Sequence, residues 1–469
     1  MIINDIADAL TRSVETVQST VSEALFEPVI RLGVTGLSRA GKTVFITSLV
    51  ANLMDRARMP GLAAAPLIQA AYLQPQPDDT IPRFAFEDHY GALTAPTPHW
   101  PEGTRQISQL RLSLRVQPSG LLSGLSGPRV VHLDIIDYPG EWLLDLALLD
   151  RSYADWSDLV LTRMAQRDSA KPFLALAPDP ASDHDEPTAK ALATAFTAYL
   201  HAARSAGYSD LTPGRFLLPG ELEGSPVLTF APLSGVERAK RGSLYREMER
   251  RYEAYKSRVV KPFFRDHFAR LDRQVVLVDA LGAINAGPRA LEDLRQTMAD
   301  ILTAFRPGRN SLLGQLVRGK RVERILFAAT KADHIHHTQH GQLTAIMDAL
   351  VDDARRRADF AGAKTQAMSL AALRATTEDM LPHDGADLPV VRGRIATDTG
   401  DKQAAFYPGE LPTDPNVLLG PARAGAPKWL DGDFQAMRFL PQRITLNPGE
   451  GPPHIRLDRA ADFLIGDKL

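Results

Sequence analysis

Apolar and polar residues alternate in blocks along the chain, and these blocks predict strands and helices in turn. Short unbroken apolar runs, typical of buried strands, lie at 29–36, 274–279, 324–330 and 365–372. Period-two alternation predicts a hairpin made of strands 106–116 and 129–136. Helical periodicity fills much of the sequence between these runs. Strands that alternate with helices indicate an α/β fold with a mainly parallel sheet covered on both faces.

The first 26 residues carry apolar positions at steps of three and four, which predicts one helix with an apolar stripe. A helix that lies on a membrane surface needs a polar face rich in lysine and arginine. This segment has one basic residue, Arg12, and several acidic residues. We therefore expect the helix to dock on the protein's own core, with a partner helix as the second possibility. The sequence has no run of 18 apolar residues and no export-signal pattern, so no membrane span is expected.

A complete phosphate-binding motif follows the first predicted strand. The segment 36–43 reads GLSRAGKT and matches GxxxxGK[ST] between a strand and a helix, the context that this motif requires. Backbone N–H groups of such a loop point at phosphate oxygens, and the helix N-terminus adds positive potential. Lys42 is expected to neutralise phosphate charge, and the Thr43 hydroxyl to bind Mg²⁺. The predicted phosphate-binding residues are Gly36, Ser38, Arg39, Ala40, Gly41, Lys42 and Thr43.

A second motif indicates which base is bound. Thr330, Lys331 and Asp333 stand at the end of the apolar run 324–330 and match [NT]KxD. A carboxylate at Asp333 can accept hydrogen bonds from both N1–H and the 2-amino group of guanine. Adenine has a lone pair at N1 and no 2-amino group, so the same carboxylate would be left unpaired. The stem of Lys331 is expected to lie along the plane of the guanine.

Two further segments are candidates for sensing the γ-phosphate. Asp137 and Gly140 follow the strand 129–136 and match DxxG, in which the aspartate reaches Mg²⁺ through water and the glycine N–H meets the γ-phosphate. Thr104 lies just before the hairpin and is assigned to switch I, the loop that closes over Mg²⁺ and the γ-phosphate. The predicted magnesium site therefore combines Thr43, Thr104 and Asp137.

The last buried strand ends in small residues that complete the predicted nucleotide site. Backbone amides of Ser369, Ala371 and Ala372 are expected to hold the O6 atom of guanine. Each of these elements stands at a strand terminus, in the order phosphate loop, threonine, DxxG, TKxD and small-residue tract. Ligands of open α/β sheets bind at the carboxyl ends of the strands, and agreement among elements counts for more than any one motif.

Some residues near the motifs have two interpretations. Glu141 stands where many GTPases carry a glutamine that orients water. Glu141 is either a catalytic residue that acts together with Lys42 and Thr104 and gives slow hydrolysis, or a solvated glutamate that starts a helix. Arg39 is either an arginine finger in cis or, as we favour, an outward residue. The histidines His334, His336, His337 and His340 predict a solvated loop in preference to a metal site.

These motifs together make the chain similar to the YcjX-like family of bacterial P-loop GTPases. The likeness is carried by the segments 36–53, 100–115, 134–146 and 330–337, and it extends over nearly the whole chain. The resemblance implies a core that binds GTP or GDP with Mg²⁺, large helical insertions and an association with stress. It also implies a membrane-protein partner, which would bring a cytoplasmic protein to the inner membrane.

The predicted organisation is a GTPase-like core of the P-loop NTPase class with additions. It comprises an N-terminal helix at 1–26, a first core part at 27–144 with an enlarged, irregular switch I at 59–104, a mostly helical insertion at 145–272, a second core part at 273–375 and a small β-rich region at 376–469. Short strands are expected in that last region at 389–396, 403–407 and 435–439.

Composition narrows the functional classes. The chain has 469 residues, of which 54 are Lys or Arg and 56 are Asp or Glu, and this balance leaves no basic excess for nucleic-acid binding. The absence of cysteine excludes disulfides, thiolate zinc sites and cysteine nucleophiles, and it fits a reducing cytosol. A guanine-nucleotide switch with slow GTP hydrolysis fits best. The alternatives are a P-loop small-molecule kinase or ATPase, which usually lacks TKxD, and a scaffold protein with a structural nucleotide.

Lys42→Ala is expected to abolish phosphate binding while the protein stays folded, because it removes a charge-assisted contact worth about 1.5–3 kcal/mol or more. Isothermal titration calorimetry with GDP measures the effect, and circular dichroism checks the fold. Unchanged GDP affinity in the variant would rule out the assignment of 36–43 as the phosphate loop.

Overall fold

A mixed sheet forms the centre of the computed structural model, which describes residues 27–37, 40–103, 106–118, 127–176, 178–235, 239–303, 322–360, 362–397, 400–429 and 434–469. The strand order is β2-β3-β4-β1-β5-β6-β7. The strands are β1 (Val29–Gly36), β2 (Ile68–Gln74), β3 (Ser108–Val116), β4 (Arg129–Asp137), β5 (Arg273–Val278), β6 (Arg324–Ala329) and β7 (Lys364–Ser369). The pairings of β2 with β3 and of β3 with β4 are antiparallel, and the four other pairings are parallel. The predicted α/β, mainly parallel fold is confirmed.

Both faces of the sheet are covered because its strands are apolar on both sides. In β5, Val275 and Leu277 face one core, and Val276 and Val278 face the other. The first core is closed by α2 (Lys42–Met54) and α17 (Leu457–Ile465). The second is closed by α11 (Ala280–Ala286), α12 (Pro288–Thr303) and α14 (His340–Leu350), with α15 (Asp352–Phe360) beside them.

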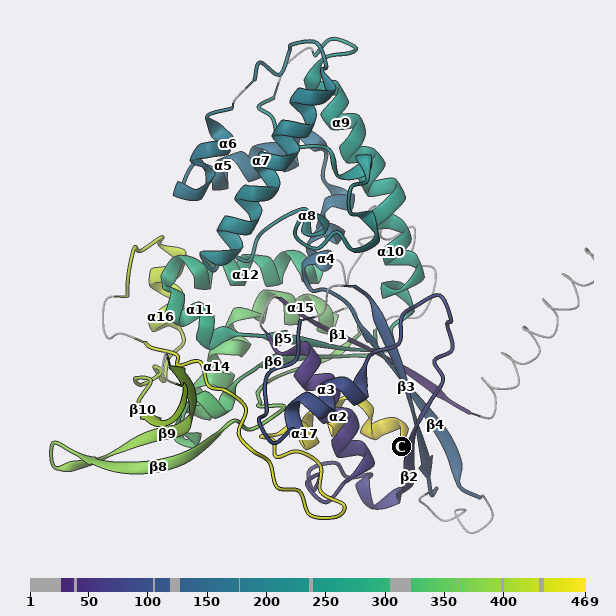
Figure 1. The fold of residues 1–469 in the computed structure, drawn as a ribbon, viewed down its shortest axis with the longest axis vertical. Helices are drawn as coiled ribbons and strands as arrows, with labels where there is room; N and C mark the ends of the chain where they lie inside the picture. Colours follow the sequence, from purple (N-terminus) through teal and green to yellow (C-terminus); the bar gives the residue numbers. More distant parts are fainter. Residues whose placement is uncertain are drawn as a thin grey trace, which may run out of the picture.

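A helical insertion stands on the second face, between β4 and β5 in the sequence (Figure 1). Its helices are α5 (Tyr153–Met164), α6 (Lys171–Leu174), α7 (Glu186–Ser205), α8 (Gly214–Leu217), α9 (Leu244–Tyr255) and α10 (Lys261–Asp266), and α4 (Glu141–Leu144) leads into it from β4. Aromatic rings fill its interior, where Trp156 stacks on Tyr252 at 5.1 Å between ring centroids. The short helices α4 and α8 lie where the insertion meets the sheet.

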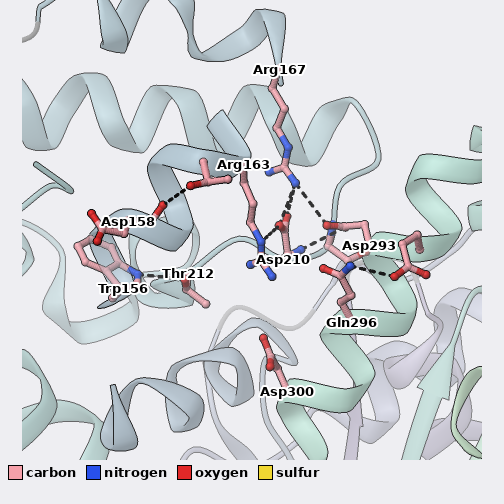
Figure 2. Close-up of polar contacts among 12 residues, drawn as sticks. Trp156, Asp158, Arg163, Arg167, Asp210, Thr212, Asp293, Gln296 and Asp300 are labelled. Atoms are coloured by element: carbon pink, nitrogen blue, oxygen red, sulfur yellow. Dashed lines mark hydrogen bonds and ion pairs between the residues drawn. The ribbon is translucent and has the colours of Figure 1, made fainter. Parts of the chain in front are cut away.

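A buried network of charges attaches the insertion to α12 (Figure 2). Asp210 forms an ion pair with Arg163 of α5 at 3.0 Å and accepts hydrogen bonds from Arg167, just after α5, at 2.7 Å. Arg167 also reaches Asp293 of α12 at 3.4 Å. Burial, reinforced by the neighbouring charge of Asp210, raises the pKa of Asp293 well above its usual range. This shift favours the protonated form of Asp293, in which the repulsion between the two carboxyl groups is smaller.

The C-terminal region contains an antiparallel sheet and also returns to the core. The sheet consists of β8 (Thr376–His383), β9 (Ala386–Thr397) and β10 (Gly400–Phe406), followed by α16 (Asn416–Arg423). The last helix, α17, packs on the central sheet, where the buried Arg273 donates to the carbonyl of Leu464 at 2.8 Å and pairs with Asp467 at 3.0 Å. The last helix therefore closes the core that lies between α2 and the central sheet.

Two predictions about local structure are wrong. The segment 59–104 is not wholly irregular, because it supplies the edge strand β2 and the helix α3 (Phe86–Thr94). The segment 435–439 forms no strand. Its Phe439 packs against the ring of His334 and over Gly393 of β9, and the bridge between Arg394 and Leu440 follows it. The predicted N-terminal helix at 1–26 lies outside the described residues. None of the helices in the described ranges is long and apolar enough to cross a membrane.

Candidate functional site

The phosphate-loop residues form a strand–loop–helix unit at the carboxyl end of β1. Gly41 precedes α2 with φ of 83°, a left-handed conformation that favours glycine. Within the described residues no side chain caps the start of α2, and its first turn carries no acidic group, so the amides there suit an anion. Lys42 folds back over the loop and donates to the carbonyl of Gly36 at 3.0 Å. Ser38 and Arg39 lie outside the described residues.

The DxxG segment lies directly against this loop. β4 and β1 are parallel neighbours with Asp137 opposite Val34, so their carboxyl ends meet at one edge of the sheet. Gly140 approaches Gly36 so closely that an added Cβ would overlap the Gly36 carbonyl oxygen. Glycine is therefore required at position 140. The buried Asp137 ends β4 on the same edge.

The predicted switch I segment reaches the same place. The Thr43 hydroxyl lies 3.5 Å from the carbonyl oxygen of Glu102, two residues before Thr104. Thr104 itself lies outside the described residues. Thr43 and Asp137 are therefore the described members of the predicted magnesium site, and a hydroxyl with a carboxylate is an oxygen donor set that suits Mg²⁺.

The predicted guanine-binding residues stand two strands away from the phosphate loop. Lys331 takes a left-handed conformation with φ of 62°, and its ammonium group pairs with Asp279 at the end of β5. Asp333 is 4% exposed and accepts a hydrogen bond from the amide of Ala375 at 2.8 Å. The amide of Ala332 donates to the carbonyl of Leu370 at 3.1 Å, which joins this loop to the one after β7.

The small-residue tract after β7 is already engaged inside the protein. The amide of Ser369 donates to the Thr344 hydroxyl at 3.1 Å, and the amide of Ala371 donates to the carbonyl of Ile455 at 3.1 Å. Both residues are buried, and Ala372 lies next to them at the chain turn. The role of Ser369, Ala371 and Ala372 in holding guanine O6 stays a prediction.

The histidine run is not the solvated loop that the sequence predicts. His336 and His340 are buried, and His340 donates to the carbonyl of Ala332 at 2.7 Å, which supports the TKxD loop. Only His337 is exposed, and it contacts Glu378 of β8 at 2.7 Å. α14 starts at His340, and ligand atoms of His336, His337 and Glu378 lie within 4.8 Å of one another, close enough for one metal ion to bind all three.

Glu141 is not a solvated glutamate either. It opens α4, is 5% exposed and forms an ion pair with Arg204 of α7, with 3.1 Å between Oε1 and Nη2. On its other side, Gly214 of α8 packs so tightly on the Glu141 carbonyl that a Cβ would not fit. Gly140 and Gly214 thus place α4 between the phosphate loop and the insertion, with no side chain in either contact.

Sequence reasoning missed the residues that continue this connection. The Asp145 carboxylate accepts hydrogen bonds from the amides of Gly214 at 2.7 Å and Arg215 at 3.3 Å, and from the Tyr255 hydroxyl at 2.5 Å. Trp142 donates to the carbonyl of Leu218 at 2.9 Å, under the guanidinium of Arg215. One signal was available, because Asp145 interrupts the otherwise apolar run WLLDLALL at 142–149.

A cavity of about 700 Å³ opens beside these contacts, between the insertion and the core. Its lining includes Leu37 of the phosphate loop, Glu141, Arg204 at the end of α7, and the pair formed by Asp279 and Lys331. The cavity therefore adjoins both the phosphate loop and the predicted guanine loop, and it carries charges of both signs.

A phosphate loop, DxxG and TKxD at neighbouring strand ends of a mainly parallel sheet define a P-loop protein of GTPase-like fold. Residues 30–469 match the family described as "YcjX-like family, DUF463", and the chain belongs to this family. The Escherichia coli (strain K12) protein named "Ras-like GTPase YcjX" is 36% identical over 458 residues, covering 94% of this chain and 96% of that protein. A Shewanella oneidensis protein of the same name is 36% identical over 474 residues, covering 94% of each chain.

The buried Asp145 makes the free energy of unfolding depend on pH. Burial raises the pKa of Asp145 to about 6, despite the three hydrogen bonds that it accepts. Because the folded pKa exceeds the unfolded value near 3.9, protonation favours the fold. The stabilisation is complete below about pH 4 and is lost as the pH rises through about 6.

Asp145→Asn is therefore expected to flatten this dependence. Between pH 4 and 7 the wild type should lose about 2 kcal/mol of unfolding free energy relative to the variant, because the folded pKa of about 6 exceeds the unfolded value near 3.9. Urea unfolding across this range measures the difference, with the exposed Asp384→Asn as the matched control. Parallel pH profiles for wild type and Asp145→Asn would contradict the account.

Proposed function

We propose that this protein is a magnesium-dependent guanine-nucleotide switch that binds GTP, hydrolyses it slowly to GDP and passes the difference to its helical insertion. The observation that carries the proposal is the contact between Gly140 and Gly36. It joins the segment expected to sense the γ-phosphate to the loop expected to hold the phosphates. The relatives named Ras-like GTPase support the same conclusion.

In this proposal each motif residue has a distinct task. Lys42 and the amides at the start of α2 bind the phosphates. Thr43, Thr104 and Asp137 would hold Mg²⁺, which would neutralise phosphate charge. Asp333 selects guanine, and its position is supported by the bond from Ala375, which fixes the carboxylate before any base arrives.

Slow hydrolysis follows from the residue after DxxG. Glu141 carries negative charge where a neutral glutamine would orient water, and it is held in an ion pair with Arg204. A carboxylate that faces an arginine is less available to position water, and its charge opposes that of the γ-phosphate. We expect a slow intrinsic rate for these two reasons.

The readout runs through α4. A γ-phosphate that draws in the amide of Gly140 would displace Glu141 and Trp142, and with them the hydrogen bonds of Asp145 to α8. From family resemblance we also propose a stress-associated role in the cytoplasm. By the same resemblance, a membrane-protein partner would bring the protein to the inner membrane.

Asp333→Asn tests the guanine assignment, because asparagine keeps an acceptor oxygen for Ala375 while its NH₂ group matches the 2-oxo group of xanthine. The variant is expected to lose about 1.5–3 kcal/mol of GTP affinity and to gain preference for XTP. Titration of GTP, XTP and ATP into both proteins measures this. Equal affinity of the wild type for ATP and GTP, or an unaltered preference in the variant, would refute guanine selection by Asp333.

A further inference from the structure

Arg204 is a charged residue that the nucleotide motifs do not account for, and its position is unusual. It is the penultimate residue of α7, which descends from the insertion toward the core (Figure 1). Its guanidinium lines the cavity that also contains Leu37 of the phosphate loop. The partial negative charge at the C-terminus of α7 favours a cation there.

A short series of contacts links Arg204 to the phosphate loop. Gly140 packs on Gly36, Glu141 follows Gly140, and Arg204 pairs with Glu141 at 3.1 Å. A cation from the insertion therefore lies one ion pair away from the segment that meets the γ-phosphate in our proposed function. Arg39, the arginine that the sequence offered for this role, lies outside the described residues.

Other arginines of the insertion have a different environment. Arg163 and Arg167 are enclosed by the carboxyl groups of Asp210 and Asp293 and keep 18% and 8% of their side chains exposed. Arg204 keeps 29% exposed and faces a cavity. A guanidinium has five N–H donors in a planar fork, which is the geometry that phosphate recognition by arginine uses.

We propose that Arg204 is an internal arginine finger, which the insertion helix α7 presents to the γ-phosphate during GTP hydrolysis while Glu141 holds it in place. The proposal rests on the GTPase function proposed above. In the reaction, the oxygen of a water molecule bonds to the γ-phosphorus, and the bond to the bridging oxygen breaks, leaving its electron pair on GDP. Both protons of the water end on the inorganic phosphate, which leaves as H₂PO₄⁻. Arg204 stays protonated and stabilises charge on the transferring group.

The test compares wild type, Arg204→Ala and Arg204→Lys with Arg246→Ala, which removes an exposed ion pair to Glu249 on α9. Single-turnover GTP hydrolysis is expected to fall by about 10³-fold in Arg204→Ala, with GDP affinity within about twofold of wild type. A second readout does not depend on turnover. Aluminium fluoride with Mg²⁺ should tighten the binding of a fluorescent GDP analogue in wild type and Arg246→Ala, but not in Arg204→Ala.

A double variant separates the finger from simple charge balance, since Arg204→Ala alone leaves the buried Glu141 carboxylate without this partner. If Arg204→Ala/Glu141→Ala, which removes the Glu141 charge without supplying a water-orienting amide, remains slow and insensitive to aluminium fluoride, the finger is supported. If it recovers the wild-type rate, Arg204 only neutralises Glu141 and the proposal is overturned. Hydrolysis within threefold of wild type in Arg204→Ala also overturns it. Absence of GTP binding in the wild type would instead refute the proposed function.

Discussion

The backbone of Gly140 rests on the carbonyl of Gly36 with no space for a side chain, and the arrangement of the whole site follows from this contact. It fixes where the DxxG segment ends relative to the phosphate loop. It also fixes where α4 begins, and therefore how Glu141 faces the insertion. Gly214 repeats the same kind of contact on the other side of Glu141. Two glycines in close backbone contact make α4 a connector that cannot shift without moving one of its neighbours.

Two attachments of the insertion to the rest of the protein differ in kind. The network of Arg163, Arg167, Asp210 and Asp293 ties it to α12 through buried charges, which are costly to separate once formed. The attachment through α4 and α8 depends on backbone contacts and on the carboxylate of Asp145. A fixed anchor beside a second attachment that borders the nucleotide site is an arrangement suited to rotation of one part about the other.

The sequence predicted the elements whose signals are local. β1, β5 and β6 are unbroken apolar runs, and the motifs stand at their ends, so the sheet and the order of its nucleotide motifs followed from pattern alone. The segment 59–104 was not predicted correctly, because β2 and α3 lie in a stretch rich in proline and alanine with weak periodicity. Nor could the pattern at 435–439 distinguish a strand from apolar residues such as Phe439 that pack on a neighbouring loop.

Contacts between distant segments were beyond the reach of pattern reasoning. Glu141 and Arg204, Asp145 and Gly214, and Arg273 and Asp467 come together only through the fold. A lone carboxylate in an apolar run could have marked Asp145 as buried, but its partners lie about seventy to over a hundred positions away. The sequence therefore located the nucleotide motifs and left open how the insertion is connected to them.

Hydrogen exchange at α4 and α8 tests that connection most directly. The amides of Gly214 and Arg215 donate to Asp145, so their protection reports whether the switch segment and the insertion remain joined. Mass spectrometry would compare the protein with GDP and with a non-hydrolysable GTP analogue, both with Mg²⁺. The account predicts that protection across 141–145 and 214–217 differs between the two nucleotides. Differences confined to the phosphate loop and to the segment before β3, with α4 and α8 unchanged, would contradict it.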